Sequence, residues 1–217
     1  MNWKHRIWTC LQIAGLAVVW LGSGAGCGGR KPSSRSRDVS EPTTVTKTLS
    51  LRIAPESSNS NARSPLSSAD VQRYESALAA AGPEASRDNA AEYAWFTVRG
   101  DVSTSKLIYS TWNSKRYVLL SNKSGEILAE IKPDSVKPES DCEGTPAVLF
   151  SLNDADARQL QDLTARNRGR ALAIVVDDVA YSIPVIMATV SNQVMITGNF
   201  TREEVRQLCL ALDSNRK

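Results

Sequence analysis

The chain has 217 residues, of which 41% are hydrophobic and 23% are charged. This balance is typical of a globular protein and excludes a wholly disordered or fibrous chain. The formal charge is +3, from 26 Lys and Arg residues against 23 Asp and Glu residues. So small an excess provides no broad basic surface, and we therefore expect no nucleic-acid partner. The single histidine is His5, so the rest of the chain has no histidine for a catalytic triad or a metal site.

The first 27 residues have the three-part plan of a secretory signal peptide. Positive residues at 4–6 precede an apolar stretch over 7–21, and a run of small residues leads into Cys27. The run Ala25-Gly26-Cys27 resembles the lipobox of bacterial lipoproteins, although Gly24 departs from that family's preference for an aliphatic residue. The resemblance implies cleavage before Cys27 and acylation of its sulfur. An uncleaved signal anchor and simple secretion stay open, and all three place the remaining chain outside the cytoplasm. For the lipid-anchored protein, the expected location is the extracytoplasmic side of a membrane in the bacterial cell envelope.

Composition separates a signal peptide and a tether from a structured region. Residues 27–45 are rich in Ser, Pro and Arg and have no apolar periodicity, which predicts a flexible tether. The prediction is a signal peptide over 1–26, a lipid-anchored tether over 27–45 and a structured region after it. The family resemblance given below implies a further division of that region into an unassigned N-terminal α+β segment over 46–104 and an α+β domain over 105–217.

The first half of the structured region is predicted to contain four strands and one helix. The strands are expected over 48–53, 92–98, 117–120 and 127–131, the last two as a hairpin around residues 122–125. The helix is expected from residue 70, with Val71, Tyr74, Ala77 and Leu78 on one face, and Gly82-Pro83 ends it.

The C-terminal third predicts the order β-α-β-β-β-α. Strands are expected over 147–152, 171–176, 179–186 and 193–197, with a turn at Asp177-Asp178. Asn153 or Asp154 caps a helix that reaches Arg168, and Gly169 provides a left-handed residue after it. Thr201 and Glu204 form a capping box before the last helix. The predicted fold class is α+β, a mixed or antiparallel sheet with helices packed on it.

Several landmarks in this third resemble SecD, the protein-export membrane subunit, in the head subdomain of its first extracytoplasmic domain. They are a strand ending in Leu-Asn, a Thr-x-x-Asn-x-Gly helix end, a Leu-Ala-Ile-Val-x-Asp strand, a Ser-x-Pro and a Gly-x-Phe-Thr. The corresponding residues here are Asn153, Thr164, Asn167, Gly169, Asp177, Pro184, Gly198, Phe200 and Thr201. The resemblance covers residues 146–212 well and 105–145 loosely, and we interpret the landmarks as structural in the first place and as partner contacts in the second.

The resemblance implies a contact role. After residue 27 the chain has no apolar stretch of 18 residues, which a bundle of membrane-spanning helices like that of SecD would require. We therefore expect a membrane-tethered, non-enzymatic module that binds polypeptide or a partner protein, with no catalytic residue, no metal and no cofactor. The alternative is an accessory lipoprotein that docks on a Sec-type membrane complex without touching substrate, and a hydrolase is the weakest hypothesis.

Cys142 and Cys209 allow two interpretations. Two cysteines outside the cytoplasm often form a disulfide. Cys209, however, falls on the apolar stripe of the last predicted helix, where a free thiol is a common core residue.

Replacing Cys27 with alanine is expected to block lipid attachment. Lipid chains anchor a protein stably when two or three of them are attached, and the variant should leave unprocessed precursor or release soluble protein. Mass spectrometry of the envelope protein checks this. An unmodified Cys27 together with an intact Met1 would instead support the signal anchor.

Overall fold

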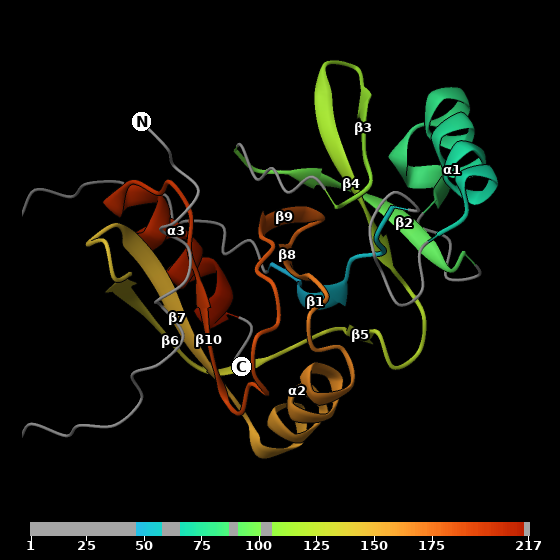
Figure 1. Ribbon diagram of the computed structural model, residues 1–217. Coiled ribbons are helices and arrows are strands. Elements are labelled where there is room, and N and C mark those ends of the chain that lie inside the picture. Colours follow the sequence, from blue (N-terminus) through green and yellow to red (C-terminus); the bar gives the residue numbers. More distant parts are fainter. Residues whose placement is uncertain (1–46, 58–65, 87–90, 101–105, 215–217) are drawn as a thin grey trace, which may run out of the picture. The chain divides into compact units, whose positions relative to one another are not determined.

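Strands dominate the secondary structure. The computed structural model describes residues 47–57, 66–86, 91–100 and 106–214. The elements, in chain order, are β1 (Leu49–Ile53), α1 (Ser68–Ala81), the short 3₁₀ helix η1 (Pro83–Ser86), β2 (Tyr93–Val98), β3 (Tyr109–Trp112), β4 (Lys115–Ser121), β5 (Ile127–Leu128), β6 (Pro133–Ser140), β7 (Pro146–Leu152), α2 (Asp154–Arg166), β8 (Leu172–Val176), β9 (Val179–Ser182), β10 (Gln193–Ile196) and α3 (Arg202–Asp213). The α+β class predicted from the sequence is confirmed (Figure 1).

The strands form two sheets. The larger has the order β3-β4-β2-β9-β8-β1-β5, with a single parallel pair between β2 and β9. The smaller has the order β10-β7-β6 and is antiparallel. The sequence predicted one sheet for the C-terminal unit, and this was wrong, because β8 and β9 join the larger sheet while β7 and β10 pair with each other. Strand pairing between distant segments is not encoded in local periodicity, which shows only that each segment is a strand.

The strand β8 lies at the boundary of two hydrophobic cores. All five of its residues are buried, as the continuous apolar run predicted. Leu172, Ile174 and Val176 face what we call the helix core, which also contains residues of β1, β7, α2, β10 and α3. Ala173 and Val175 face what we call the strand core, whose members are Ala54, Ala94, Phe96, Val98, Leu107, Val118, Leu120, Ala171, Ala173, Val175, Ala180 and Ile183. No described helix contributes to the strand core, whose members lie in strands or within two residues of one.

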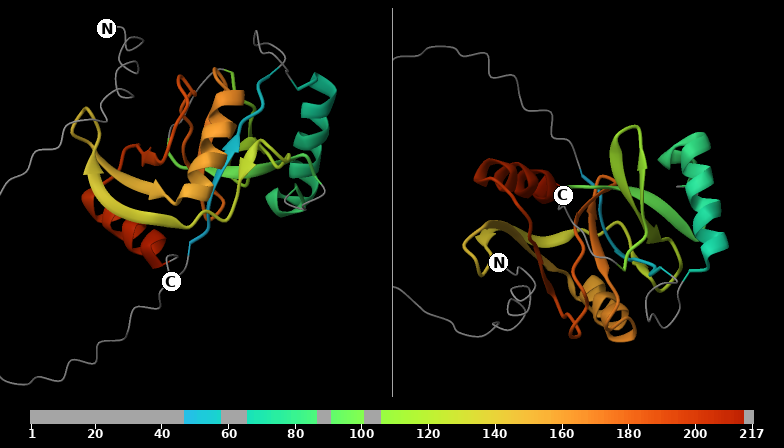
Figure 2. Two further views of the ribbon diagram at one scale, coloured as in Figure 1. Left: turned by 90° about the horizontal axis from the view of Figure 1, so that it is seen from below. Right: turned by 45° about the horizontal axis from the view of Figure 1, so that its top comes forward.

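The helices cover the remaining apolar faces. Leu160 and Leu163 of α2, and Val205, Leu208 and Leu212 of α3, all belong to the helix core. The helix α3 lies along β6 and β7 of the smaller sheet (Figure 2). The helix α1 packs on a third, aromatic core, where Trp95 is fully buried and its indole N–H donates to the carbonyl of Tyr74 at 2.9 Å.

The helix ends follow the predicted capping chemistry. Asn153 is the N-cap of α2 and Thr201 that of α3, with Glu204 completing the capping box. The side chain that caps α1 is Ser67. Gly82 follows α1, and Gly169 follows α2, both with positive φ, where glycine has no steric penalty.

The hairpin predicted from residues 117–120 and 127–131 is not formed. The strand β4 pairs with β3 through the two-residue turn Asn113-Ser114, in which both φ angles are positive. The strand β5 pairs with β1 at the opposite end of the larger sheet. The two-residue turn at Asn113-Ser114 places β3 beside β4. The chain after residue 121 therefore continues to β1 and does not fold back on β4.

The boundary predicted between residues 104 and 105 does not divide the structure. The strands β1 and β2 lie in the same sheet as β3, β4, β5, β8 and β9, and all the described residues belong to one compact unit. The predicted signal peptide, the tether and Cys27 lie outside the described residues. In the described part of the chain, no helix has the length and apolar character needed to cross a bilayer.

Replacing Gly169 with valine is expected to lower the free energy of unfolding by about 1–2 kcal/mol. Its φ is +84° and no atom lies within 4 Å of an added Cβ, so the loss would report backbone strain without a clash. Gly169→Asn is the control, because asparagine tolerates positive φ better. Urea unfolding measures both variants, and equal losses would contradict the assignment.

Candidate functional site

The residues that carry the SecD resemblance lie at three separate places. Asn153, Thr164, Asn167 and Gly169 lie at the two ends of α2. Asp177 and Pro184 flank β9, and the Gly198–Thr201 segment leads into α3. They do not converge on one site, and each place therefore has to be examined for what its contacts do.

The landmarks at the end of α2 are buried and hydrogen-bonded. Thr164 is fully buried; its hydroxyl donates to the carbonyl of Leu160 at 2.8 Å and accepts from the N–H of Val190 at 3.0 Å. The side-chain amide of Asn167 donates to the carbonyl of Leu163 at 2.8 Å. The bond from Val190 connects α2 to the loop before β10, and the other two bonds hold the last turn of α2.

An ion pair closes this network. The guanidinium of Arg170 donates to Asn167 Oδ1 at 2.7 Å and to Glu126 Oε1 at 2.5 Å. Burial would raise the pKa of Glu126, but hydrogen bonds from Arg170 and Ser121 outweigh it and lower the pKa. The carboxylate therefore stays ionised and paired, which suits a structural contact better than a proton donor.

Asp177 and Pro184 also form hydrogen bonds with the backbone of neighbouring strands. Asp177 accepts from Lys47 Nζ at 2.6 Å and from the N–H of Thr48 at 2.9 Å, which connects the β8–β9 turn to the beginning of β1. The carbonyl of Pro184 accepts from the N–H of Leu172 at 2.9 Å. The Pro184 ring is exposed.

The segment before α3 builds a cluster around Arg99. Phe200 is buried and stacks on Tyr181, with ring centroids 6.0 Å apart and an interplanar angle of 14°. The guanidinium of Arg99 lies 4.3 Å from the Phe200 centroid and 5.7 Å from that of Tyr181. A Cβ on Gly198 would lie 3.1 Å from the Phe200 ring, so a larger residue there would require the ring to shift. We call Arg99, Tyr181, Phe200 and Glu204 the Arg99 cluster.

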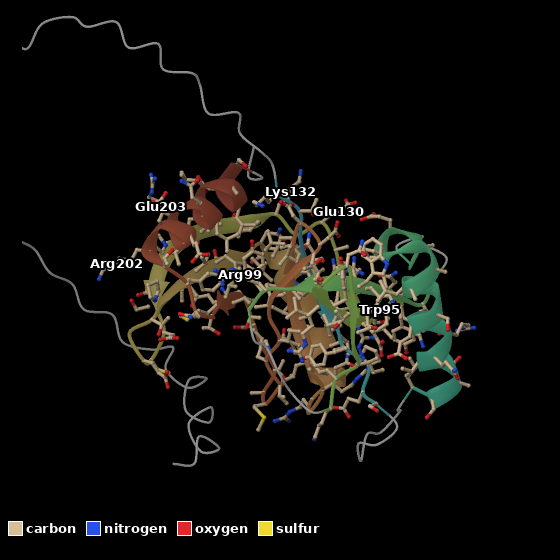
Figure 3. The ribbon with its side chains drawn as sticks, turned by 90° about the horizontal axis from the view of Figure 1, so that it is seen from above. Trp95, Arg99, Glu130, Lys132, Arg202 and Glu203 are labelled. Atoms are coloured by element: carbon tan, nitrogen blue, oxygen red, sulfur yellow. The ribbon has the colours of Figure 1, made fainter. Side chains whose placement is uncertain are left out.

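Glu204 completes the Arg99 cluster. One carboxylate oxygen accepts from the guanidinium of Arg99, and the other accepts from the N–H of Thr201 at 2.8 Å. The Thr201 N–H and, after it, Arg99 lower the pKa of Glu204 to about 2. Figure 3 shows Arg99 over the middle of the molecule, whereas Arg202 and Glu203 extend from α3 at its margin. The cluster joins the end of β2 to the beginning of α3.

Sequence analysis missed Arg99. It follows a strand end and precedes Gly100, which is typical of a turn, and its partners are 82 to 105 residues away. No local pattern could have indicated this contact.

The two edges of the smaller sheet differ. In an antiparallel ladder, alternate residues direct their backbone groups toward the partner strand and away from it. The N–H of Leu152 donates to the carbonyl of Asn192, so the backbone N–H and C=O groups of residues 194 and 196 point toward β7. The backbone groups of Gln193 and Met195 point outward. No described strand pairs with β10 on that side. We call this row of groups the outer edge of β10.

The outer edge of β6 is protected. The N–H of Asp141 donates to the carbonyl of Thr145, so residues 137 and 139 face β7, and Val136, Pro138 and Ser140 face outward. Pro138 has no N–H to offer at its outward position, and Lys137 and Glu139 place charges beside it. Proline and charge are the usual means of blocking an exposed strand edge.

The cysteine pair is not a disulfide. Cys209 is a free cysteine on α3, partly buried against the helix core. Cys142 is exposed in the β6–β7 turn. The Cys142–Cys209 bridge that the sequence allowed is thus absent, because Cys209 packs into the core while Cys142 lies at the tip of a hairpin.

The described residues line a small cavity beside α2. A cavity of about 240 Å³ lies between α2 and residues 124–128. Sites for organic ligands have volumes of about 300–1,000 Å³. In the described ranges, no three His, Cys, Asp or Glu side chains are grouped as metal ligands would be.

Replacing Arg99 with alanine is expected to lower the free energy of unfolding by about 1–3 kcal/mol, since it removes a cation–π contact and a charged hydrogen bond. Arg206→Ala is the matched control. Arg206 pairs with Glu203 on the exposed face of α3, so this substitution should change the free energy of unfolding little. Denaturant unfolding compares the two, and equal effects would contradict a structural role for the Arg99 cluster.

The Arg99→Ala substitution should also raise the pKa of Glu204 from about 2 toward its ordinary value of 4.5, but only part of the way, because Thr201 still donates. A lowered folded-state pKa adds stability that is fully present above pH 4.5 and is lost as the pH falls toward 2. NMR titration of the carboxyl carbons measures the shift. Glu203, whose pKa Arg206 and Gln207 lower to about 2, should not move. An unchanged Glu204 would show that the ion pair is not formed.

Comparison with known proteins agrees with the landmarks. The family model of the P1 head subdomain of SecDF matches residues 105–216. The protein translocase subunit SecD of Aquifex aeolicus is 45% identical over 69 residues, which are 32% of this chain and 14% of that protein. The SecD of Rhodothermus marinus is 35% identical over 99 residues, which are 45% of this chain and 16% of that protein. This chain therefore matches only a small part of the length of these relatives.

A solved structure of SecDF, a membrane component that enhances protein export, is 20% identical to this chain. The matched region is 79% of this chain and 64% of the SecDF chain, and the TM-score is 0.44. The family match extends over more than half of the chain and includes the whole β3–α3 region. The chain belongs to the SecDF P1 head subdomain family.

Proposed function

We propose that this chain is a non-enzymatic, membrane-tethered module of the bacterial cell envelope that binds extended polypeptide during protein export. The observation that carries the proposal is the family match over residues 105–216. The matched relatives are SecD subunits of the protein translocase, and the matched SecDF is a membrane component that enhances protein export.

The contacts of the landmark residues support a binding role over a catalytic one. Thr164, Asn167 and Asp177 are engaged in bonds that hold backbone. Among the described residues, the carboxyl groups with shifted pKa values are Glu126, Glu203 and Glu204, and all three are lowered. A general acid at neutral pH needs a raised pKa, so these groups suit ion pairs rather than proton transfer.

The N-terminal sequence supplies the proposed attachment. Acylation at Cys27 would leave residues 28–48 between the lipid and β1. Even fully extended, a segment of that length reaches about 75 Å at most, so the module would act close to the membrane surface. That position suits contact with polypeptide that emerges from a membrane complex.

Equilibrium binding of an unfolded polypeptide tests the proposal. The probe is reduced, carboxymethylated lactalbumin, which cannot refold, and the control is the native disulfide-bonded form of the same protein. The full-length chain should bind the unfolded probe and not the native one, because only the unfolded probe offers extended backbone. Fluorescence anisotropy measures both affinities.

The alternative role predicts a different result. An accessory protein that docks on a Sec-type membrane complex without substrate contact would bind neither form of lactalbumin. Chemical crosslinking in native membranes would then yield one fixed set of membrane partners. This combination would overturn the polypeptide-binding proposal.

A further inference from the structure

We propose that the outer edge of β10 is the place where this module receives polypeptide, as an added strand of the smaller sheet. This inference rests on the function proposed above and deepens it by naming the site. Gln193 is exposed and Met195 is half-buried, and the backbone N–H and C=O groups of both point away from β7. Such a row of unpaired groups is the template that a strand-addition site offers.

The chemistry of β10 selects an extended, uncharged occupant. The strand reads Gln-Val-Met-Ile, without a charge or a proline. Val194 and Ile196 turn into the helix core, and Met195 lies on the opposite face. A strand added here would place alternate side chains beside each face, so segments with apolar residues at every second position fit best.

The other edges are less suitable. The edge of β6 is blocked by Pro138 and its charged neighbours, as described above. The strand β5 has only two residues. The edge strand β3 also has no charge or proline of its own, but the guanidinium of Arg116, on the neighbouring strand β4, lies 4.0 Å from the ring centroid of Tyr109. Of the two edges of the smaller sheet, β10 is the one without a proline or a charge in the strand.

Main-chain recognition explains how one surface serves many sequences. The added hydrogen bonds are made by backbone groups that every residue except proline possesses. Affinity per segment is then modest and sequence-tolerant, which suits transient contact with unfolded chains.

The test compares two proline variants of the full-length chain. Met195→Pro removes the outward N–H of β10, and Ser140→Pro removes an outward N–H of β6, so neither should break a bond to β7. The probe is a fluorescein-labelled ten-residue peptide of alternating valine and threonine with a lysine at each end. Met195→Pro should weaken its binding roughly tenfold, the effect of one lost hydrogen bond, whereas Ser140→Pro should bind like the unchanged chain.

Amide hydrogen exchange provides a second measurement. The N–H groups of Gln193 and Met195 should exchange at least tenfold more slowly with the peptide bound, and those of Val136 and Ser140 should not change. A peptide with N-methyl groups at every second residue should give no protection. Circular dichroism verifies that Met195→Pro is folded, and Met195→Lys, which adds a charge without altering the backbone, replaces it if it is not.

The outcomes separate the inference from the proposed function. If Met195→Pro binds the peptide and unfolded lactalbumin as well as the unchanged chain does, the edge is not the site, although the function stands. If the unchanged chain binds neither probe, the proposed function fails. If Met195→Pro abolishes a dimer seen by ultracentrifugation and the peptide does not bind, the edge pairs with a second copy and the inference is overturned.

Discussion

The burial of β8 on both faces is the constraint on which the rest of this structure depends. Its five apolar residues pair with β1 on one side and β9 on the other. Leu172, Ile174 and Val176 supply one core and Ala173 and Val175 the other, so the same strand belongs to both. A polar residue at any of these positions would be placed in a core, because no face of the strand reaches water.

The division into two sheets follows from this arrangement. The helix-core face of β8 and β1 is apolar and has to be covered, and α2, α3 and the smaller sheet cover it together. The smaller sheet has only three strands and therefore presents two edges close to each other. One edge contains Pro138, and the other leaves the backbone groups of β10 without a described strand partner. Under the proposal made above, this difference directs an added polypeptide strand to β10.

The residues that identify the family are engaged in holding the fold. Asn167 bonds to α2 and Arg170, Asp177 bonds to the beginning of β1, and Phe200 stacks on Tyr181 beneath Arg99. Their side chains are therefore committed to internal contacts, and the surface proposed for binding is made of main-chain groups. This separation is physically reasonable for a module that contacts many sequences, because backbone recognition places few demands on residue type.

The sequence by itself determined the local structure and the family. Helix caps at Asn153 and Thr201, the positive φ of Gly169 and the buried run of β8 all depend on neighbouring residues, and these predictions are confirmed. Only the tertiary structure decided which strands pair, that β5 crosses to β1, and that Arg99 meets Phe200 and Glu204. These contacts join residues far apart in the chain, and periodicity cannot show them because it reports which face of an element is buried and not what buries it.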